Sequence, residues 1–191
     1  MQAIQVLVKE QNQINQALEI GSELIRQVKS GVSMQKELLR DLVAFLESYA
    51  CRHYYSKIDE VVLPWIEDRL ETRYPEISQW LEIEKDTAMA YLKRINASLD
   101  EDSNEETLAE NLSSFQWLLR WQIDMHANVI LSIAKRLGEE DDDHLLLQYD
   151  QVAPEGRHKR AEADRQLIVF TRKLNPALES QQTPAAFQQV V

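Results

Sequence analysis

The chain has 191 residues, of which 44% are hydrophobic and 28% are charged, and its formal net charge at pH 7 is -11. This size suits one compact domain with a sizeable core, and the low counts of 4 glycines and 5 prolines favour an all-helical protein. The acidic balance argues against nucleic acid and anionic membrane surfaces as partners.

The sequence also indicates in which cellular compartment the protein is expected. No stretch approaches the roughly 20 apolar residues that a membrane span needs, and the first residues lack the basic start and cleavage site of a signal peptide. Cys51 is the single cysteine, so an intrachain disulfide is excluded. We therefore expect a cytoplasmic protein in which Cys51 is a buried or half-buried side chain rather than a nucleophile.

Apolar residues at helical spacing predict a first helix over residues 2–29 and a second over residues 34–70. A single polar residue interrupts the inner apolar stripe of each helix. It is Gln11 in the first helix and Tyr54 in the second. Pro64 lies inside the second helix, where it removes one backbone donor, so we expect a bend there.

A third helix is predicted over residues 76–98, and Lys85 interrupts its apolar stripe. An acidic linker follows at residues 100–106. Within it, the run from Ser103 to Glu106 is typical of a capping box and predicts the start of a fourth helix, which should end at Gly138.

The fourth helix has an apolar face from Phe115 to Leu137 that is broken in the middle by Gln122 and His126. These two residues are four apart, so their side chains are neighbours that point toward the core. Burying an amide and an imidazole without partners would cost roughly 1–3 kcal/mol each. Facing helices should therefore supply partners. Trp121 lies beside this stripe, where it could line a pocket or a partner surface.

The C-terminal part predicts two short helices, at residues 144–152 and 157–174. We expect residues 1–138 to form an all-α, up-down-up-down four-helix bundle, because four long amphipathic helices with short connections pack most simply in that way. Residues 139–175 should form a helical extension that packs on the bundle. Residues 176–191 are rich in Gln, Ala and Pro and predict a flexible tail.

Each long helix has its polar interruption near the middle of its stripe. We expect these residues to meet at one level and form a closed hydrogen-bonded cluster: Gln11, Tyr54, Lys85, Gln122 and His126. His126 is the one obvious metal ligand among them, and a lysine ammonium repels cations, so the pattern predicts neither a metal nor a cofactor. The alternative is a set of partly solvated residues near one end of the bundle.

The four helical segments resemble the hemerythrin-like family, the HHE cation-binding domains, over about residues 1–150. The segments that carry the resemblance are VLVKEQNQI, LVAFLESYACRHYYSKIDEVVLPWIE, LEIEKDTAMAYLKRI and LLRWQIDMHANVILSIAKRL. The resemblance implies the fold and a di-iron ancestry. It also implies that the family's iron ligands have all been replaced, because its ligand positions hold Gln11, Tyr54, Ile58, Lys85, Gln122 and His126.

We therefore expect a hemerythrin-like protein without a di-iron site that acts as a non-catalytic binding or regulatory partner of another protein. In that interpretation Lys85 supplies the positive charge that the metal would have carried. Two alternatives stay open. One is a small-ligand or anion sensor, or an enzyme, that uses the vacated cavity. The other is a remodelled metal or haem site that uses His126 with Tyr54 or His53. The sequence also leaves open whether the chain forms a homodimer.

Overall fold

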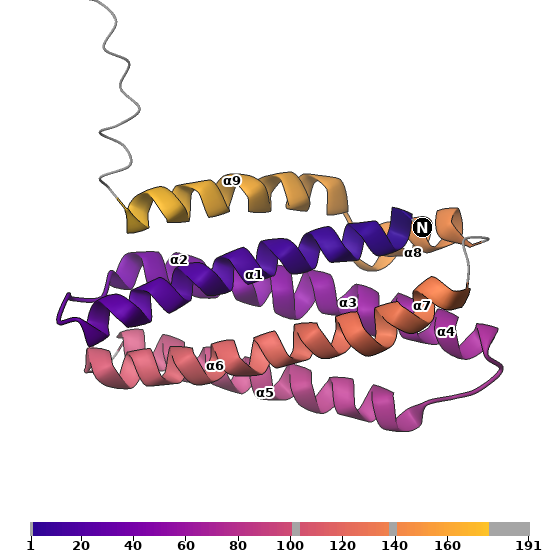
Figure 1. Cartoon of the computed structure of the whole chain (residues 1–191), viewed down its shortest axis with the longest axis horizontal. Coiled ribbons are helices and arrows are strands. Elements are labelled where there is room, and N and C mark those ends of the chain that lie inside the picture. The colour runs from indigo at the N-terminus through magenta and orange to yellow at the C-terminus, as the bar shows by residue number, and fades with distance from the viewer. Residues whose placement is uncertain (1, 101–103, 138–140, 176–191) are drawn as a thin grey trace, which may run out of the picture.

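The computed structural model describes residues 2–100, 104–137 and 141–175. This part of the chain is all-helical and contains no strand. The long helices lie side by side along the long axis of the molecule, and α9 (Gly156–Leu174) covers the outer side of α1 (Gln2–Lys29) (Figure 1). In the described residues, no helix combines the length and the apolar character that crossing a membrane would require.

The second long helix is continuous but not uniform. Its parts are α2 (Lys36–Phe45), η1 (Leu46–Tyr54), α3 (Tyr55–Lys57), η2 (Ile58–Val62) and α4 (Leu63–Arg69). The η segments are wider, π-helical turns. Pro64 cannot donate the hydrogen bond that a regular helix requires at its position, and its ring crowds the preceding turn. The chain stays helical across Pro64, and the wider turns of η2 immediately precede it.

The third long helix is α5 (Pro75–Asp100), and the fourth consists of α6 (Glu105–Met125), η3 (His126–Ile130) and α7 (Leu131–Leu137). The extension contains α8 (Asp142–Val152) and α9. All six predicted helical segments are confirmed, with ends that differ by a few residues. Asn104 caps α6, and its side chain accepts a hydrogen bond from the backbone N–H of Glu106 at 3.1 Å. Ser103 of the predicted capping box lies outside the described residues, as does the predicted tail.

Asp141 and Asp142, at the start of α8, bind residues at the ends of α1 and α4. The Asp142 carboxylate accepts hydrogen bonds from the backbone N–H groups of Gln2 and Ala3, at 2.6 and 2.8 Å. Asp141 accepts from the Trp65 indole at 2.8 Å and from Arg69 Nε at 2.7 Å. A carboxylate at a helix N-terminus satisfies backbone donors that would otherwise lack partners, so Asp142 acts as a remote cap for α1.

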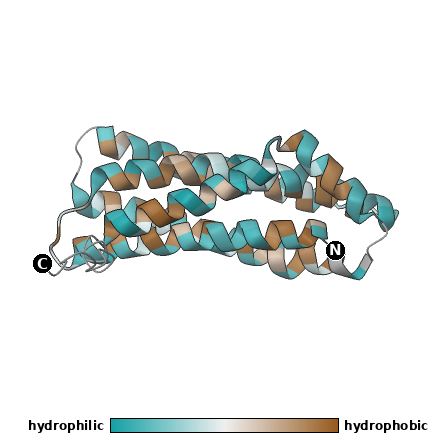
Figure 2. Cartoon of the chain, turned by 90° about the horizontal axis from the view of Figure 1, so that it is seen from above, coloured by the Kyte–Doolittle hydropathy of each residue, from teal (hydrophilic) through white to brown (hydrophobic). Residues whose placement is uncertain are grey.

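The core lies between the long helices. Apolar residues recur along each of them between polar ones, which is the pattern of helices with one buried face (Figure 2). Fully burying one such side chain stabilises the fold by roughly 1.5–3 kcal/mol. The extension adds its own apolar contacts, with these side chains buried against the long helices: Leu145, Tyr149, Ala163, Leu167, Phe170 and Leu174.

Candidate functional site

Polar side chains from all four long helices meet in the middle of the core. We call this group the central cluster, and it consists of Gln11, Tyr54, Tyr55, Glu84, Gln122 and His126. Gln11 Nε2 donates a hydrogen bond to the Tyr54 hydroxyl at 2.8 Å. Burial raises the pKa of Tyr54 far above its ordinary value, so the phenol stays protonated.

A second chain of hydrogen bonds crosses the cluster. The Tyr55 hydroxyl donates to the Gln122 side-chain oxygen, and Gln122 Nε2 donates to the backbone oxygen of Glu84 at 3.1 Å. The Gln122 amide is therefore satisfied on both sides, as a fully buried amide requires. The predicted partners for Gln122 do exist, but they are Tyr55 and the α5 backbone, which were not among the residues expected in the cluster.

The prediction that Lys85 points into the core is wrong. Lys85 is exposed, and the preceding residue, Glu84, is buried instead. Glu84 lies three residues after Leu81 and Lys85 lies four, and both spacings are compatible with one helical face. The buried Glu84 carboxylate faces the imidazole of His126, with 3.7 Å between Oε2 and Nε2. Lys85 keeps its ammonium in water, which avoids the cost of burying it.

The remaining predicted site residues are buried. Ile58 is fully buried and supplies only apolar surface. His126 is also fully buried, its ring contacts those of Tyr54, Tyr55 and Trp80, and neither ring nitrogen has a hydrogen-bond partner among the described residues. In the described part of the chain, no three His, Cys, Asp or Glu side chains gather in a way that could hold a metal ion.

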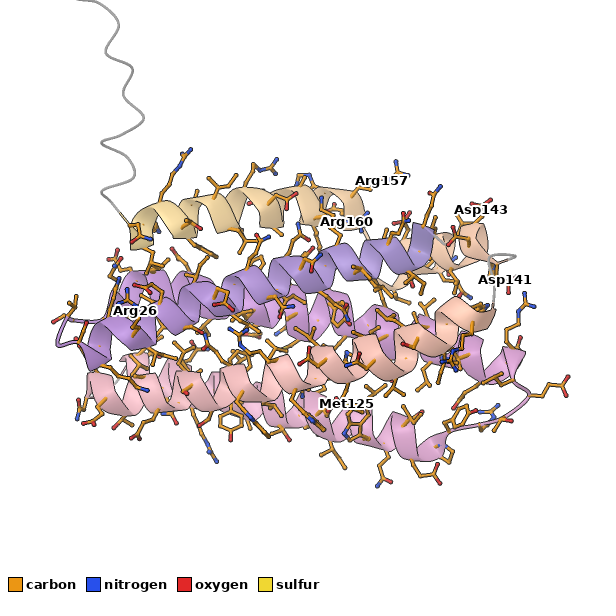
Figure 3. The ribbon with its side chains drawn as sticks, in the orientation of Figure 1. Arg26, Met125, Asp141, Asp143, Arg157 and Arg160 are labelled. Atoms are coloured by element: carbon orange, nitrogen blue, oxygen red, sulfur yellow. The ribbon has the colours of Figure 1, made fainter. Side chains whose placement is uncertain are left out.

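A second group of buried polar side chains lies between α1, η1, α3 and α9. We call it the lateral cluster, and it consists of Glu10, His53, Lys57 and Arg160. Glu10 Oε1 accepts hydrogen bonds from Lys57 Nζ at 2.5 Å and from Arg160 at 3.0 Å. The side chains of Glu10 and Lys57 are 0% and 1% exposed, so this is a buried ion pair. Arg160 lies at the N-terminal end of α9 (Figure 3).

The ionisation of the lateral cluster follows from its burial. Burial alone would raise the pKa of Glu10, but the contact with His53 together with the charge and the hydrogen bond of Lys57 outweighs it, and the pKa is lowered. Burial lowers the pKa of Lys57, against the attraction of Glu10. Burial also lowers the pKa of His53, so its ring is neutral at pH 7.

The hydrogen bonds fix the tautomer of His53. Lys57 Nζ lies 2.8 Å from His53 Nε2, and an ammonium can only donate. His53 Nε2 must therefore accept, which places the ring proton on Nδ1. That atom is buried and has no hydrogen-bond partner among the described residues.

The sequence analysis missed this cluster because it assigned one inner face to each helix. On α1, a second buried row runs beside the predicted stripe: Ala3, Glu10, Gln13, Ala17 and Leu24. Two of these residues, Glu10 and Gln13, were too polar to suggest burial. The available signal was the helical spacing of small and polar residues on the side that α9 later covers.

Cys51 lies in the buried core and in neither of the two clusters. Its side chain is buried, and burial raises the pKa of the thiol to about 12. The thiolate, which is the reactive form, is therefore scarce at neutral pH.

Large apolar side chains are exposed where α5 lies beside α6. We call the surface around the contact between Trp80 and Trp121 the tryptophan face. It also includes Trp117, four residues before Trp121, and Ile83, three residues after Trp80. Trp80 is partly buried, and the other three side chains are exposed. Trp117 is 68% exposed, Ile83 58% and Trp121 40%. The Trp80 and Trp121 rings pack edge to face with centroids 5.6 Å apart. Trp80 also contacts the His126 ring, so the face connects directly with the central cluster.

Comparisons of this chain with protein-family models, with curated proteins and with solved structures found no match. Function therefore has to be inferred from the residues themselves.

Proposed function

We propose that the chain is a non-catalytic, hemerythrin-like protein that binds another protein through the tryptophan face. In this proposal the four long helices form an up-down-up-down bundle, and the central cluster replaces the family's iron site with hydrogen bonds. Supporting observations are the segments that resemble the family and the convergence of Gln11, Tyr54, Gln122 and His126 in the core.

The observation that carries the binding role is the exposure of Trp117, Trp121 and Ile83. Tryptophan is among the residues most enriched at the energetic centres of protein interfaces, because it buries much apolar area at little entropic cost. Neighbouring exposed aromatic side chains at a helix pair are uncommon on a surface that contacts only water. The face is also pre-organised, since Trp121 packs on Trp80 and Trp80 packs on His126.

Charge around the face restricts the partner. Exposed acidic side chains flank it at helical spacing, with Glu76 four residues before Trp80, Asp86 three residues after Ile83 and Asp124 three residues after Trp121. Together with the net charge of -11, these residues disfavour a second copy of the same chain. We expect a partner that presents an apolar surface bordered by basic side chains.

The chemistry of the central cluster favours binding over catalysis. Tyr54, Gln122 and His126 are fully buried, and the raised pKa of Tyr54 makes it a poor proton donor or metal ligand at neutral pH. The alternative proposal of a ligand in a vacated cavity would require a route from solvent to these atoms.

The test compares two double variants of the full chain. Trp117→Ala with Trp121→Ala removes most of the tryptophan face. Ile168→Ala with Val169→Ala removes two exposed apolar side chains from α9 and serves as the matched control. We expect both variants to keep the wild-type circular dichroism spectrum, because the four side chains are 40–68% exposed and lie outside the core.

Tagged wild-type and variant proteins would be recovered from extracts of the source cells. The proposal expects one partner in stoichiometric amount with the wild type and the control, and a loss of at least about tenfold with the tryptophan variant. Equal recovery with both variants, or no stoichiometric partner with the wild type, would overturn it.

A further inference from the structure

The outward side of α9 carries cations and small apolar side chains in one stripe. The helix lies on the outside of the molecule, with α1 on its inner side (Figure 1). Five exposed residues of α9 follow one another at spacings of three or four, so they share one face of the helix: Arg157, Ala161, Arg165, Ile168 and Arg172. We call this face the α9 stripe. Val169, beside the stripe, is also exposed.

The α9 stripe is basic in an acidic protein. The helix contains six lysine and arginine residues and two acidic ones, whereas the whole chain has a net charge of -11. Arg157 and Arg172 make no hydrogen bond or ion pair with the residues that the structure describes. Arg165 pairs with Glu162, one turn before it on the same helix. The two unpaired guanidinium groups are therefore available to carboxylates from another molecule.

An apolar groove adjoins the stripe. It is a hollow of about 490 Å³ between α9 and the segments α2 and η1, and Phe45, Val169 and Phe170 contribute apolar side chains to its lining. The Phe45 and Phe170 rings meet edge to face, with centroids 6.0 Å apart. An apolar side chain that enters the groove would therefore contact aromatic and aliphatic surface.

The carboxylates that line the groove already have counter-charges. Asp41 lies 2.7 Å from Lys173 Nζ, and Glu162 lies 2.6 Å from Arg165. The groove is therefore close to neutral, while the stripe beside it is positive. This arrangement favours a helix with an apolar face and acidic edges, which places apolar groups in the groove and carboxylates on the stripe. An anionic membrane fits less well, because its broad surface would also meet the acidic remainder of the protein.

We propose that the α9 stripe and the adjoining groove bind an acidic amphipathic helix of a partner protein. Apolar side chains of that helix enter the groove, and its carboxylates pair with Arg157, Arg165 and Arg172. Arg157 and Arg172 are 15 residues apart. At 1.5 Å per residue this is about 22 Å, so the partner helix has at least about four turns. The site is separate from the tryptophan face and does not rest on the function proposed for that face.

The first test titrates the full chain with two synthetic helical peptides of about five turns, measured by calorimetry. Both peptides have leucine along one face, and the residues beside that face are glutamate in one peptide and lysine in the other. We expect the glutamate peptide to bind, more weakly as the salt concentration rises, and the lysine peptide to bind at least about tenfold more weakly. Equal affinities, or no binding of the glutamate peptide, would overturn the proposal.

Reversing the two unpaired charges tests the stripe itself. Arg157→Glu with Arg172→Glu should weaken binding of the glutamate peptide at least about tenfold. The fold should persist, because both side chains are exposed and their opposite effects on the helix dipole offset each other. Lys93→Glu with Arg136→Glu changes the net charge equally at exposed positions of α5 and α7 and should bind like the wild type. Equal losses in the two variants would mean that net charge alone governs binding and would overturn the site.

Removing apolar side chains tests the groove. Ile168→Ala with Val169→Ala should weaken binding of the glutamate peptide several-fold, because less apolar surface is buried. Unchanged binding would overturn the role of the groove. Trp117→Ala with Trp121→Ala should bind the peptide like the wild type, and the alanine variant of α9 should still recover the partner of the tryptophan face. The two proposals therefore fail independently.

Two other occupants of the stripe are distinguished with the same variants. Vesicles of equal parts phosphatidylcholine and phosphatidylserine should not co-sediment with the wild-type chain. Co-sedimentation that is lost in Arg157→Glu with Arg172→Glu would overturn the proposal in favour of a membrane surface. A wild-type dimer that the same variant dissociates, measured by analytical ultracentrifugation, would overturn it in favour of a second copy of the chain.

Discussion

The two buried polar clusters are built from different chemistry. The central cluster joins amides and phenols, and its one carboxylate faces an imidazole. The lateral cluster joins Glu10 to two cations, Lys57 and Arg160, at side-chain exposures of 0%, 1% and 16%. The side chains of the central cluster all come from the four long helices, whereas the lateral cluster depends on a residue from α9. The comparison indicates that the extension completes the core rather than merely covering it.

The largest expected effect is in the lateral cluster. Glu10→Gln should lower the free energy of unfolding by about 3–5 kcal/mol, because it leaves the buried Lys57 ammonium without its counter-charge. Urea denaturation measures this loss. Glu19→Gln, which removes a carboxylate from an exposed ion pair with Arg120, is the control and should cost at most about 1 kcal/mol. Equal losses in the two variants would mean that the Glu10–Lys57 pair is not buried.

A smaller loss is expected in the central cluster. Tyr54→Phe removes the hydroxyl that accepts from Gln11, and the buried amide keeps only a long contact of 3.5 Å to the backbone oxygen of Ile123. We expect a loss of about 1–3 kcal/mol in the free energy of unfolding. Tyr91→Phe, at a partly exposed position on α5, should stay within about 0.5 kcal/mol of the wild type. If Tyr54→Phe leaves the free energy of unfolding unchanged, the Gln11 amide must have another hydrogen-bond partner.

The lateral cluster should lose stability in acid. The ordinary pKa of His53 is 6.5, and the folded protein lowers it through burial and the nearby charge of Lys57, with Lys159 adding to the effect and Glu10 opposing it. Below pH 6.5 the unfolded chain therefore binds more protons than the folded chain, and stability falls as the pH falls.

Glu10 adds to this loss at lower pH. Its pKa is lowered in the folded protein, so the stability that its carboxylate contributes is lost progressively once the pH drops below 4.5, its ordinary value. His53→Gln should therefore flatten the dependence of Tm on pH between about 7 and 5. His158→Gln, at an exposed position of α9, should leave that dependence unchanged. Matching slopes in the wild type and His53→Gln would show that His53 does not titrate differently on folding.

The smallest expected effect is at Lys85. Because this side chain is exposed, Lys85→Gln should change the free energy of unfolding by less than about 0.5 kcal/mol. Glu84→Gln should have a larger effect, since it alters a buried carboxylate that faces His126. If Lys85→Gln is instead the more destabilising of the two, then Lys85 points into the core as the sequence pattern suggested.

The helices could be predicted from the sequence because apolar spacing and the turn residues define them locally. The central cluster could be predicted in part, since Gln11, Tyr54, Gln122 and His126 interrupt strongly apolar stripes. The sequence could not decide which of Glu84 and Lys85 is buried. Both fit the helical spacing of the α5 stripe, and the contact that distinguishes them is with His126, on another helix. Arg160 could not be found either, since it reaches Glu10 from 150 residues further along the chain.

The tryptophan face was only hinted at by the sequence. Trp121 lay beside the predicted stripe, but the side-by-side packing of α5 on α6 is what brings Trp80 against it. A pattern within one helix does not contain that information.

The most direct test of the proposed function is the affinity of the recovered partner for three forms of the chain, measured by titration calorimetry. We predict that Trp117→Ala with Trp121→Ala weakens binding at least about tenfold, as expected for hot-spot residues. Tyr54→Phe, which alters only the central cluster, should bind like the wild type. Weakened binding by Tyr54→Phe with unchanged binding by the tryptophan variant would contradict the account and move the function from the surface to the core.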